Sequence, residues 1–313
     1  MFTINLTYWG NGTTIEQIIG PNLVVRIFLI FLTLIIVALG ICGNGIVLYS
    51  SIKCNVIDMD RVSIILLEHL AVADILVTIL RTLPMLITLC FNGWVLGSAL
   101  CFVNGVMGHI PLGFEAILLA MISLHRLYIV THPKDPTISR LKVKLSLAFV
   151  WSFCCVYIAP IVMVDSVVYV IPYKSQCDFT FIKYSYYYRV TRAVMMLILL
   201  STILISNIVM FVIATKQASQ ITGSSAPRRS AVITISSICL AYLLSYTPFM
   251  LCEVLWYRNI QPGWYGMFYS YMLTLNTIVN PIIYTLTNVK FRDHLVRMCR
   301  LNNNNVAGQR FRF

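Results

Sequence analysis

Charged residues are scarce in this chain of 313 residues. Asp, Glu, Lys and Arg together make up 11% of the sequence, whereas a soluble domain carries about 25%. Hydrophobic residues account for 59%. A chain of this composition cannot shield its apolar surface from water. The scarcity of charge therefore excludes an ordinary soluble domain and predicts a protein that sits in a lipid bilayer.

The residue patterns of common enzymes are absent as well. The sequence contains no Gly-rich phosphate loop, no metal-ligand spacing and no nucleophile with its activating partners. It also contains no internal repeat of the kind that marks many transporters. The missing motifs argue against an enzyme and against a metal-dependent protein. The missing repeat argues against a transporter without excluding one.

The chain does contain long apolar runs. A helix rises 1.5 Å per residue, so about 20 apolar residues cross the roughly 30 Å of hydrocarbon in a bilayer. Such runs predict an all-α membrane protein, a seven-transmembrane helix bundle, with an N-terminal segment at 1–24, the bundle at 25–287 and a C-terminal segment at 288–313. The predicted spans are 25–51, 62–90, 98–130, 143–167, 187–215, 230–257 and 263–287.

Two independent signals predict the orientation. Asn5 and Asn11 begin Asn-x-Thr sequons, which are glycosylated on the extracellular or lumenal side. Most Lys and Arg residues fall in the loops and tail of the opposite side, as the positive-inside rule requires. We expect a multi-pass plasma-membrane protein with an extracellular N-terminus and a cytoplasmic C-terminus. The net charge of +12 reflects this bias and gives no reason to expect a nucleic acid partner.

The segment after the last span predicts a short amphipathic eighth helix. Phe291 and Leu295 are one turn apart on one face, and Arg292 and Arg297 occupy the rest of the surface. Such a helix lies on the inner leaflet. Cys299 beside it is a candidate palmitoylation site, although a free thiol fits the sequence equally well.

Short motifs fall at helix-specific places along the chain. They are Gly43-Asn44-Gly45, Leu70-Ala71-Val72-Ala73-Asp74, Cys101, His125-Arg126-Leu127, Trp151, Ser245-Tyr246-Thr247-Pro248 and Asn280-Pro281-Ile282-Ile283-Tyr284. In this order they resemble the pattern of rhodopsin-like, or class A, G-protein-coupled receptors over almost the whole chain. The resemblance implies a receptor that binds an extracellular ligand and activates a heterotrimeric G protein by outward movement of the sixth helix. A membrane transporter or channel is the alternative.

The resemblance also implies which residues carry the coupling. In that family an arginine matching Arg126 is held at rest by a preceding acid and sometimes by an acid at the inner end of the sixth helix. Here the preceding residue is His125, and the sixth helix offers Arg228 and Arg229. The sequence therefore predicts that Arg126 has no acidic anchor and that basal activity is raised. A plain interfacial histidine is the other interpretation of His125. The implied coupling residues are His125, Arg126, Tyr246, Pro248, Asn280, Pro281 and Tyr284.

Polar side chains inside the spans predict an ion or proton site. Hydrocarbon offers them no partners, so they must pair with one another, with water or with ions. Asp74 and Glu115 should project into one cavity, where two carboxylates cannot both ionise cheaply. With Asn44, Asn276 and Asn280 they form a predicted allosteric sodium or proton site. Hydrogen bonds that only join the helices are the alternative. No other metal or cofactor is expected.

Charged residues near the outer ends of the spans predict a ligand pocket. Arg81 and Arg192 could clamp a carboxylate or phosphate, although pairing with Glu253 or extension to the interface explains them equally well. Gly108 stands where amine receptors carry Asp, which argues against a monoamine. The predicted pocket is Arg81, Gly108, His109, Arg192, Tyr246, Phe249 and Glu253, and its ligand is a peptide or an acidic small molecule. The resemblance further implies a disulfide between Cys101 and Cys177, which share the oxidising compartment.

Overall fold

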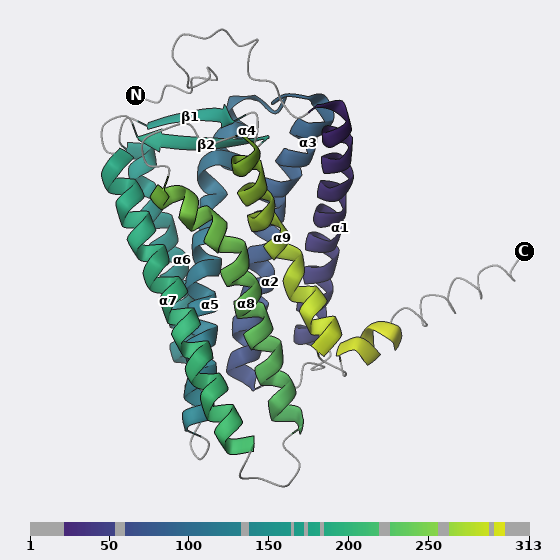
Figure 1. Cartoon of the computed structure of the whole chain (residues 1–313), viewed down its shortest axis with the longest axis vertical. Coiled ribbons are helices and arrows are strands. Elements are labelled where there is room, and N and C mark those ends of the chain that lie inside the picture. The colour runs from purple at the N-terminus through teal and green to yellow at the C-terminus, as the bar shows by residue number, and fades with distance from the viewer. Residues whose placement is uncertain are drawn as a thin grey trace, which may run out of the picture.

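The computed structural model is a bundle of long helices lying side by side, with a two-stranded hairpin across one end (Figure 1). It describes residues 22–53, 60–132, 138–163, 166–171, 175–181, 185–218, 226–255, 263–287 and 291–297. The elements are α1 (Leu23–Lys53), α2 (Arg61–Val77), η2 (Thr78–Thr82), α3 (Leu83–Phe91), α4 (Gly97–Phe102), η3 (Val103–Met107), α5 (His109–Thr131), α6 (Arg140–Met163), β1 (Ser166–Ile171), β2 (Gln176–Phe181), α7 (Ser185–Ala218), α8 (Ala226–Leu255) and α9 (Gly263–Thr287).

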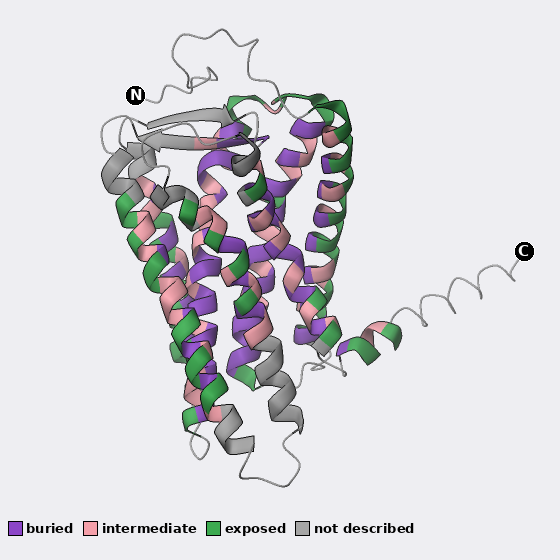
Figure 2. Ribbon diagram, in the orientation of Figure 1, coloured by how far each residue is buried: buried purple, intermediate pink, exposed green. Residues whose placement is uncertain are grey.

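The helices have the length and the apolar outward surface that crossing a bilayer requires. Most of their backbone hydrogen bonds form within each helix, which is what a chain crossing hydrocarbon requires. Within the described residues, five segments are long and apolar enough to cross: Leu23–Ile52, Arg61–Phe91, Gly97–Thr131, Arg140–Ala159 and Val190–Ile213. The outward faces carry large apolar side chains such as Phe211, Leu244 and Leu286, whereas buried residues line the inside (Figure 2). This distribution fits a protein surrounded by lipid.

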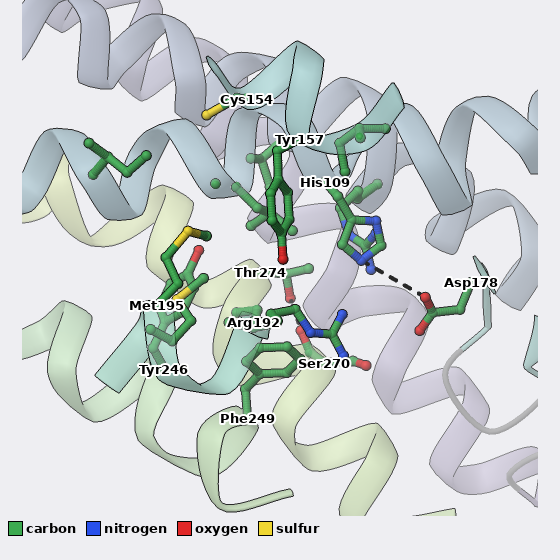
Figure 3. A pocket seen from close by; sticks show the side chains of 18 of the residues that line it. His109, Cys154, Tyr157, Asp178, Arg192, Met195, Tyr246, Phe249, Ser270 and Thr274 are labelled. Atoms are coloured by element: carbon green, nitrogen blue, oxygen red, sulfur yellow. Dashed lines mark hydrogen bonds and ion pairs between the residues drawn. The ribbon is translucent and has the colours of Figure 1, made fainter. Parts of the chain in front are cut away.

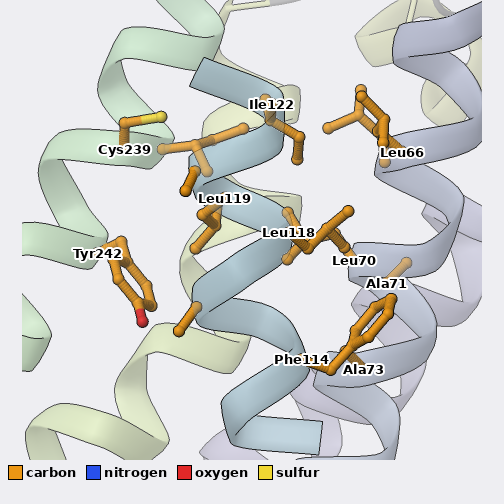
Figure 4. Packing of buried hydrophobic residues seen from close by; sticks show 14 of the residues in the cluster. Leu66, Leu70, Ala71, Ala73, Phe114, Leu118, Leu119, Ile122, Cys239 and Tyr242 are labelled. Atoms are coloured by element: carbon orange, nitrogen blue, oxygen red, sulfur yellow. The ribbon is translucent and has the colours of Figure 1, made fainter. Parts of the chain in front are cut away.

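The bundle packs around α5. Figure 4 shows Leu118 and Ile122 facing the α2 side chains Leu70 and Leu66, while Leu119 points toward α8. Lipid tails are as apolar as leucine, so this packing is stabilised by the close fit of the side chains and not by exclusion of water. The core therefore fixes the position of α5, the helix that carries four of the predicted functional residues: His109, Glu115, His125 and Arg126.

Two π-helical turns precede prolines. Pro84 follows η2, and Pro111 follows η3. Proline lacks an N–H and its ring collides with the carbonyl four residues earlier, so the preceding turn must widen or kink. Pro84 has no N–H to donate to the Leu80 carbonyl four residues earlier. Asn104 Nδ2 donates to that carbonyl instead, at 2.9 Å. This hydrogen bond joins the two π turns to each other.

The same pattern recurs between α1 and α9. Pro281 lies inside α9 and cannot donate to the Thr277 carbonyl four residues earlier. Asn44 Nδ2 from α1 donates to this carbonyl at 2.7 Å and to the Gly40 carbonyl at 2.9 Å. An asparagine from a neighbouring helix therefore supplies the donor that the proline lacks.

The hairpin corrects the sequence-based prediction in one detail. The fourth span was expected to continue to residue 167, but α6 ends at Met163 and β1 begins at Ser166. The segment from 166 to 171 is rich in valine, and β-branched residues favour strands over helices. β1 pairs antiparallel with β2. The predicted disulfide is present between Cys101 of α4 and Cys177 of β2 and attaches the hairpin to the bundle.

A further helical segment follows α9 at residues 291–297. Phe291 is buried and lies edge-on to Tyr284 with 6.2 Å between the ring centroids, while Arg292 and Arg297 are exposed. This is the amphipathic arrangement that the sequence predicts. Asn5, Asn11 and Cys299 lie outside the described residues, as do the side chains of Arg228, Arg229 and Glu253.

Gly108 lies directly beneath the side chain of Arg81. A Cβ at Gly108 would come within 2.6 Å of Arg81 Cγ, closer than real side chains approach. The Arg81 side chain can therefore cross α5 at this level only because residue 108 has no side chain. The backbone at Gly108 is an ordinary right-handed helical one, so close approach and not backbone freedom requires glycine here.

Replacing Gly108 with alanine should displace Arg81. We expect Gly108→Ala to destabilise the detergent-solubilised protein by about 1–3 kcal/mol, as overpacking does elsewhere. Gly113→Ala on the same helix is the matched control, because its Cβ would meet only Cys154 Sγ at 3.7 Å. A helical Gly→Ala change without a clash stabilises by about 0.4–1 kcal/mol. Thermal unfolding of both variants checks the prediction, and equal Tm values would contradict it.

Candidate functional site

A pocket lies near the disulfide end of the bundle (Figure 3). Its walls are mostly apolar and aromatic, as ligand pockets usually are, and they include Phe153, Tyr157, Met195, Tyr246 and Phe249. The charged side chains, the histidine and the glutamine in these walls come from four different elements: Arg81 of η2, His109 of α5, Gln176 and Asp178 of β2, and Arg192 of α7. The pocket is thus enclosed by segments that are far apart in the sequence.

Arg81 is held by hydrogen bonds from both sides. Its NH2 donates to Gln176 Oε1 at 2.9 Å, and its NH1 donates to the Asn104 carbonyl at 3.3 Å. Asn104 also accepts a hydrogen bond from the Cys177 backbone N–H at 2.7 Å. The disulfide-bonded strand and the two π turns therefore fix the guanidinium in one place. Rigid placement of this kind suits a side chain that recognises a ligand.

The other charged groups of the pocket lie close to Arg81. His109 Nδ1 is 3.5 Å from Arg81 NH1, and His109 Nε2 is 3.9 Å from Asp178 Oδ1. The Arg192 guanidinium lies over the ring of Phe249, 5.3 Å from its centroid, in a cation–π contact. Figure 3 shows Arg192 beside Phe249 and Ser270 and shows the contact between His109 and Asp178. Two arginines against one carboxylate make the pocket cationic.

The structure brings several of the predicted pocket residues to one cavity. Arg81, His109, Arg192, Tyr246 and Phe249 all line the pocket. Gly108 is not among the lining residues, because the side chain of Arg81 covers it.

The polar cluster in the middle of the bundle consists of two separate acid–amide pairs. Asn280 Nδ2 donates to Asp74 Oδ2 at 2.7 Å, and Asn276 Nδ2 donates to Glu115 Oε1. Both acids are almost completely buried. Since Asn276 and Asn280 are one turn apart on α9, that helix binds α2 through one acid and α5 through the other. Among the described residues no group of three His, Cys, Asp or Glu side chains gathers around a metal position.

The oxygens of this cluster fit a small hard cation. Asp74 Oδ1 and Asn44 Oδ1 are buried, and neither has a hydrogen-bond partner among the described residues. Carboxylate and amide oxygens are the ligands that hard cations prefer. A proton on either acid would equally reduce the repulsion between the two carboxylates. The residues present therefore fit the predicted sodium or proton site.

The ring of Tyr246 connects this cluster with the pocket. Tyr246 lines the pocket and is buried beside Glu115. It stacks on Tyr242, one turn earlier on α8, with 4.0 Å between ring centroids. Pro248 follows two residues later, inside α8. A side chain that lines the pocket is therefore next to both the acid of α5 and the proline of α8.

At the opposite end of the bundle, Asp60 pairs with both His125 and Arg126. Asp60 Oδ1 lies 3.0 Å from His125 Nε2, and Asp60 Oδ2 lies 3.4 Å from Arg126 NH1. The expectation that Arg126 lacks an acidic anchor is therefore wrong. The acid comes neither from residue 125 nor from the sixth helix, but from the residue just before α2. Tyr284 is buried and lies near Arg126 on the α9 side.

Asp60 is ionised under ordinary conditions. Burial by itself would raise the pKa of its carboxyl, but hydrogen bonds from His125 and Ser63, together with the charge of Arg126, hold the pKa well below its usual range. A group whose pKa is lowered by folding stabilises the folded protein fully at pH values above its unfolded pKa. This stabilisation is lost as the pH falls through the pKa of the folded state. The Asp60 interactions therefore persist through neutral and mildly acid pH.

Sequence reasoning missed Asp60, Asn104, Gln176 and Asp178. An aspartate just before an apolar helical run, with serine three residues on, is an N-cap signal that could have located Asp60 at the start of a helix. Gln176 and Asp178 flank Cys177, and the disulfide places both beside the bundle. Nothing in the sequence indicates that Asp60 contacts residues 65 positions away.

Comparison with known proteins gives a consistent family. Residues 43–284 match the family described as 7 transmembrane receptor (rhodopsin family). The chain is similar to the tachykinin-like peptides receptor 86C of Drosophila melanogaster, with 26% identity over 82% of this chain and 56% of that protein. It is similar to the C-X-C chemokine receptor type 3 of Bos taurus, with 26% identity over 86% and 76%. It is also similar to the thyrotropin-releasing hormone receptor of Gallus gallus, with 24% identity over 88% and 79%.

The aligned part of the chain spans 56% of the length of the Drosophila relative. The family match includes Asn44, Asp74, Arg126 and Pro281, four of the residues from which the resemblance was inferred. The structure brings these residues together inside one helical bundle whose outward faces are apolar. The chain therefore belongs to the rhodopsin family of seven-transmembrane receptors, and it is a multi-pass membrane receptor and not an enzyme.

Proposed function

We propose that this receptor binds an anionic group of an extracellular peptide in the pocket at the disulfide end and activates a heterotrimeric G protein at the Arg126 end. The observation that carries the proposal is the presence of a cationic pocket and a buried, acid-bound arginine at opposite ends of α5, the central helix. Membership of the receptor family supports the coupling.

The chemistry of the pocket supports an anionic ligand group. Arg81 and Arg192 offer planar guanidinium groups, which match carboxylate and phosphate in geometry and charge. Asp178 gives the pocket one acceptor for a ligand amine or amide. The Drosophila relative is a receptor for tachykinin-like peptides, which supports a peptide over an acidic small molecule. A free carboxylate, at the C-terminus or on an acidic side chain, fits the two arginines best.

The path from ligand to G protein passes through Tyr246. A ligand that moves this ring changes the surroundings of Glu115 and the stacking on Tyr242. Pro248 weakens α8 at the same level because it donates no N–H to the Leu244 carbonyl. Rotation of α8 about this point moves its far end outward and opens the Arg126 end to the G protein. Tyr284 then approaches Arg126 in place of Asp60.

The central cluster is proposed to hold a sodium ion or a proton in the resting receptor. Asp74, Glu115 and the oxygens of Asn44, Asn276 and Asn280 would hold it, and a positive charge there offsets the repulsion between the two acids. Helix movement that separates α9 from α2 or α5 breaks one acid–amide pair and weakens the site. The cluster thereby favours the resting arrangement.

The proposed orientation places the disulfide end outside the cell. Disulfides persist in oxidising compartments, and sequons at Asn5 and Asn11 require the same side. The helical segment at 291–297 then lies at the cytoplasmic surface, with Arg292 and Arg297 available to anionic lipid and Cys299 as a candidate for palmitoylation. The receptor functions in the plasma membrane.

The coupling proposal predicts that Arg126→Ala abolishes G-protein activation and leaves ligand binding intact, because Arg126 is at the end of the bundle remote from the pocket. A peptide library screened on cells with a promiscuous G-protein readout supplies the agonist. Leu124→Ala, an exposed position on the same helix, is the control. Signalling of Arg126→Ala equal to that of the parent at equal surface expression would refute the proposal.

The ligand proposal predicts that Arg192→Ala lowers agonist potency by about 10- to 100-fold, the loss expected when a charge-assisted hydrogen bond is removed. Each active peptide is compared with its carboxyl-amidated form, and the preference for the free acid should disappear in the variant. Met195→Ala, an uncharged lining residue on the same helix, is the control. Arg81→Ala should weaken binding too, but it also lowers Tm because Arg81 packs on Gly108. Unchanged potency in both arginine variants would discard the anionic-ligand proposal.

The cluster proposal predicts that Glu115→Gln removes most of the sodium and pH dependence of basal signalling, because the variant lacks one of the two repelling acids. Basal signalling is measured in membranes with sodium replaced by choline and over a range of pH. Glu68→Gln, an acid on α2 outside the cluster, should behave like the parent. The same sodium and pH dependence in Glu115→Gln as in the parent would rule the proposal out.

A further inference from the structure

We propose that Asp60 is the acid that holds Arg126 in the resting receptor, and that the chain has this anchor at the start of α2 instead of on α5. Asp60 acts as a positioning residue: it keeps the guanidinium turned toward α2 until activation releases it. This inference rests on the proposed coupling for its main readout, and a second readout does not depend on coupling.

Asp60 is the counter-charge of Arg126. The arginine side chain is 7% exposed, so water does little to stabilise it. Its Nε and NH2 have no hydrogen-bond partner among the described residues, and its NH1 has Asp60. Asp60 is also the one acid that the described residues place in ion-pair contact with Arg126. Removing Asp60 leaves the buried guanidinium without its counter-charge, which disfavours the arrangement. The resting position of Arg126 is therefore sensitive to Asp60.

Asp60 is itself held rigidly. It is the N-cap of α2, with extended backbone angles, and its side chain accepts hydrogen bonds from Ser63 N at 3.0 Å and Ser63 Oγ at 2.6 Å. The positive end of the helix dipole favours an anion at this position. The carboxylate is thus oriented by α2 before Arg126 contacts it. An acid held in this way anchors its partner better than a mobile loop acid.

His125 is compatible with an acid that reaches Arg126 from residue 60. Its Nε2 lies 3.0 Å from Asp60 Oδ1, so it bonds to one carboxylate oxygen while Arg126 pairs with the other. An acid at residue 125 would instead place a second negative charge against Asp60, and like charges at this distance repel strongly. His125 is therefore the residue that accommodates an anchor from another helix.

A purely structural role for Asp60 as a helix cap gives different expectations. Asparagine caps helices about as well as aspartate, so Asp60→Asn retains the cap and removes the charge. Ser63→Ala also retains the cap, because the capping donor is the backbone N–H of residue 63, and it removes only the Oγ hydrogen bond to the carboxylate while leaving the ion pair. If Asp60 only caps α2, both variants should signal like the parent. If it anchors Arg126, Asp60→Asn alone should raise basal signalling.

The first experiment measures basal nucleotide exchange on purified Gs, Gi and Gq heterotrimers by membranes that contain equal amounts of each variant, without ligand. We expect Asp60→Asn to raise the basal rate about two- to ten-fold, because loss of a partly exposed ion pair shifts a two-state equilibrium by about that factor. Ser63→Ala should remain near the parent. The double variant Asp60→Asn/His125→Asp returns an acid to the neighbourhood of Arg126 and should restore a low rate. A rate in Asp60→Asn no higher than that of the parent or of Ser63→Ala overturns the proposal.

The second experiment tests the contact without any G protein. The Tm of detergent-solubilised Asp60→Asn, Arg126→Gln and the double variant forms a thermodynamic cycle. We expect non-additivity, with the double variant more stable than the sum of the single effects predicts. Additive effects overturn the proposal. If no protein, the parent included, activates any heterotrimer while the cycle is non-additive, the proposed coupling fails and the anchor stands. If Asp60→Asn yields no folded protein, Asp60→Ser, which also caps helices, replaces it in both experiments.

Discussion

Hydrocarbon contains no hydrogen-bond partners, so a carbonyl that a proline leaves without its helical donor is costly unless another group of the protein donates to it. Pro84 and Pro281 each create this situation, and Asn104 and Asn44 each resolve it by donating to the carbonyl four residues before the proline. These two bonds join η2 to η3, and α1 to α9. Asn104 also bonds to the backbone of Cys177 and so to the hairpin. The position of Arg81, and with it the shape of the pocket, depends on this arrangement.

The lack of hydrogen-bond partners in hydrocarbon also explains why the other buried charged groups pair with residues of neighbouring helices. Asp74 and Glu115 each bind one asparagine of α9, and Arg126 binds Asp60. Every one of these contacts crosses between helices, so each changes when the helices move relative to one another. A polar group that is expensive to leave unpaired in lipid is therefore also a group that senses helix movement. For this reason buried polar residues occur in the pocket, in the central cluster and at the Arg126 end of the bundle.

Asp60 and His125 show how the same physical interaction can be supplied from a different position in the sequence. A resting anchor requires only a carboxylate within reach of the guanidinium, and the start of α2 lies close enough to both Arg126 and His125 to provide it. The fold supplies this proximity. A motif that covers three consecutive residues cannot record an interaction between positions 60 and 126, so the lack of an acid at residue 125 does not imply the lack of an anchor.

Composition, apolar runs and the order of short motifs determined the membrane location, the helical bundle and the family, because these depend on local hydrophobicity and on the spacing of residues along each helix. The sequence also indicated Arg81, His109 and Arg192 as pocket residues, since charged and polar side chains near the end of a span are costly to place against lipid. Only the tertiary structure revealed the hairpin, the burial of Gly108 under Arg81 and the partner of Arg126. Each of these is a contact between segments distant in sequence, and its existence depends on how the helices pack and not on any local pattern.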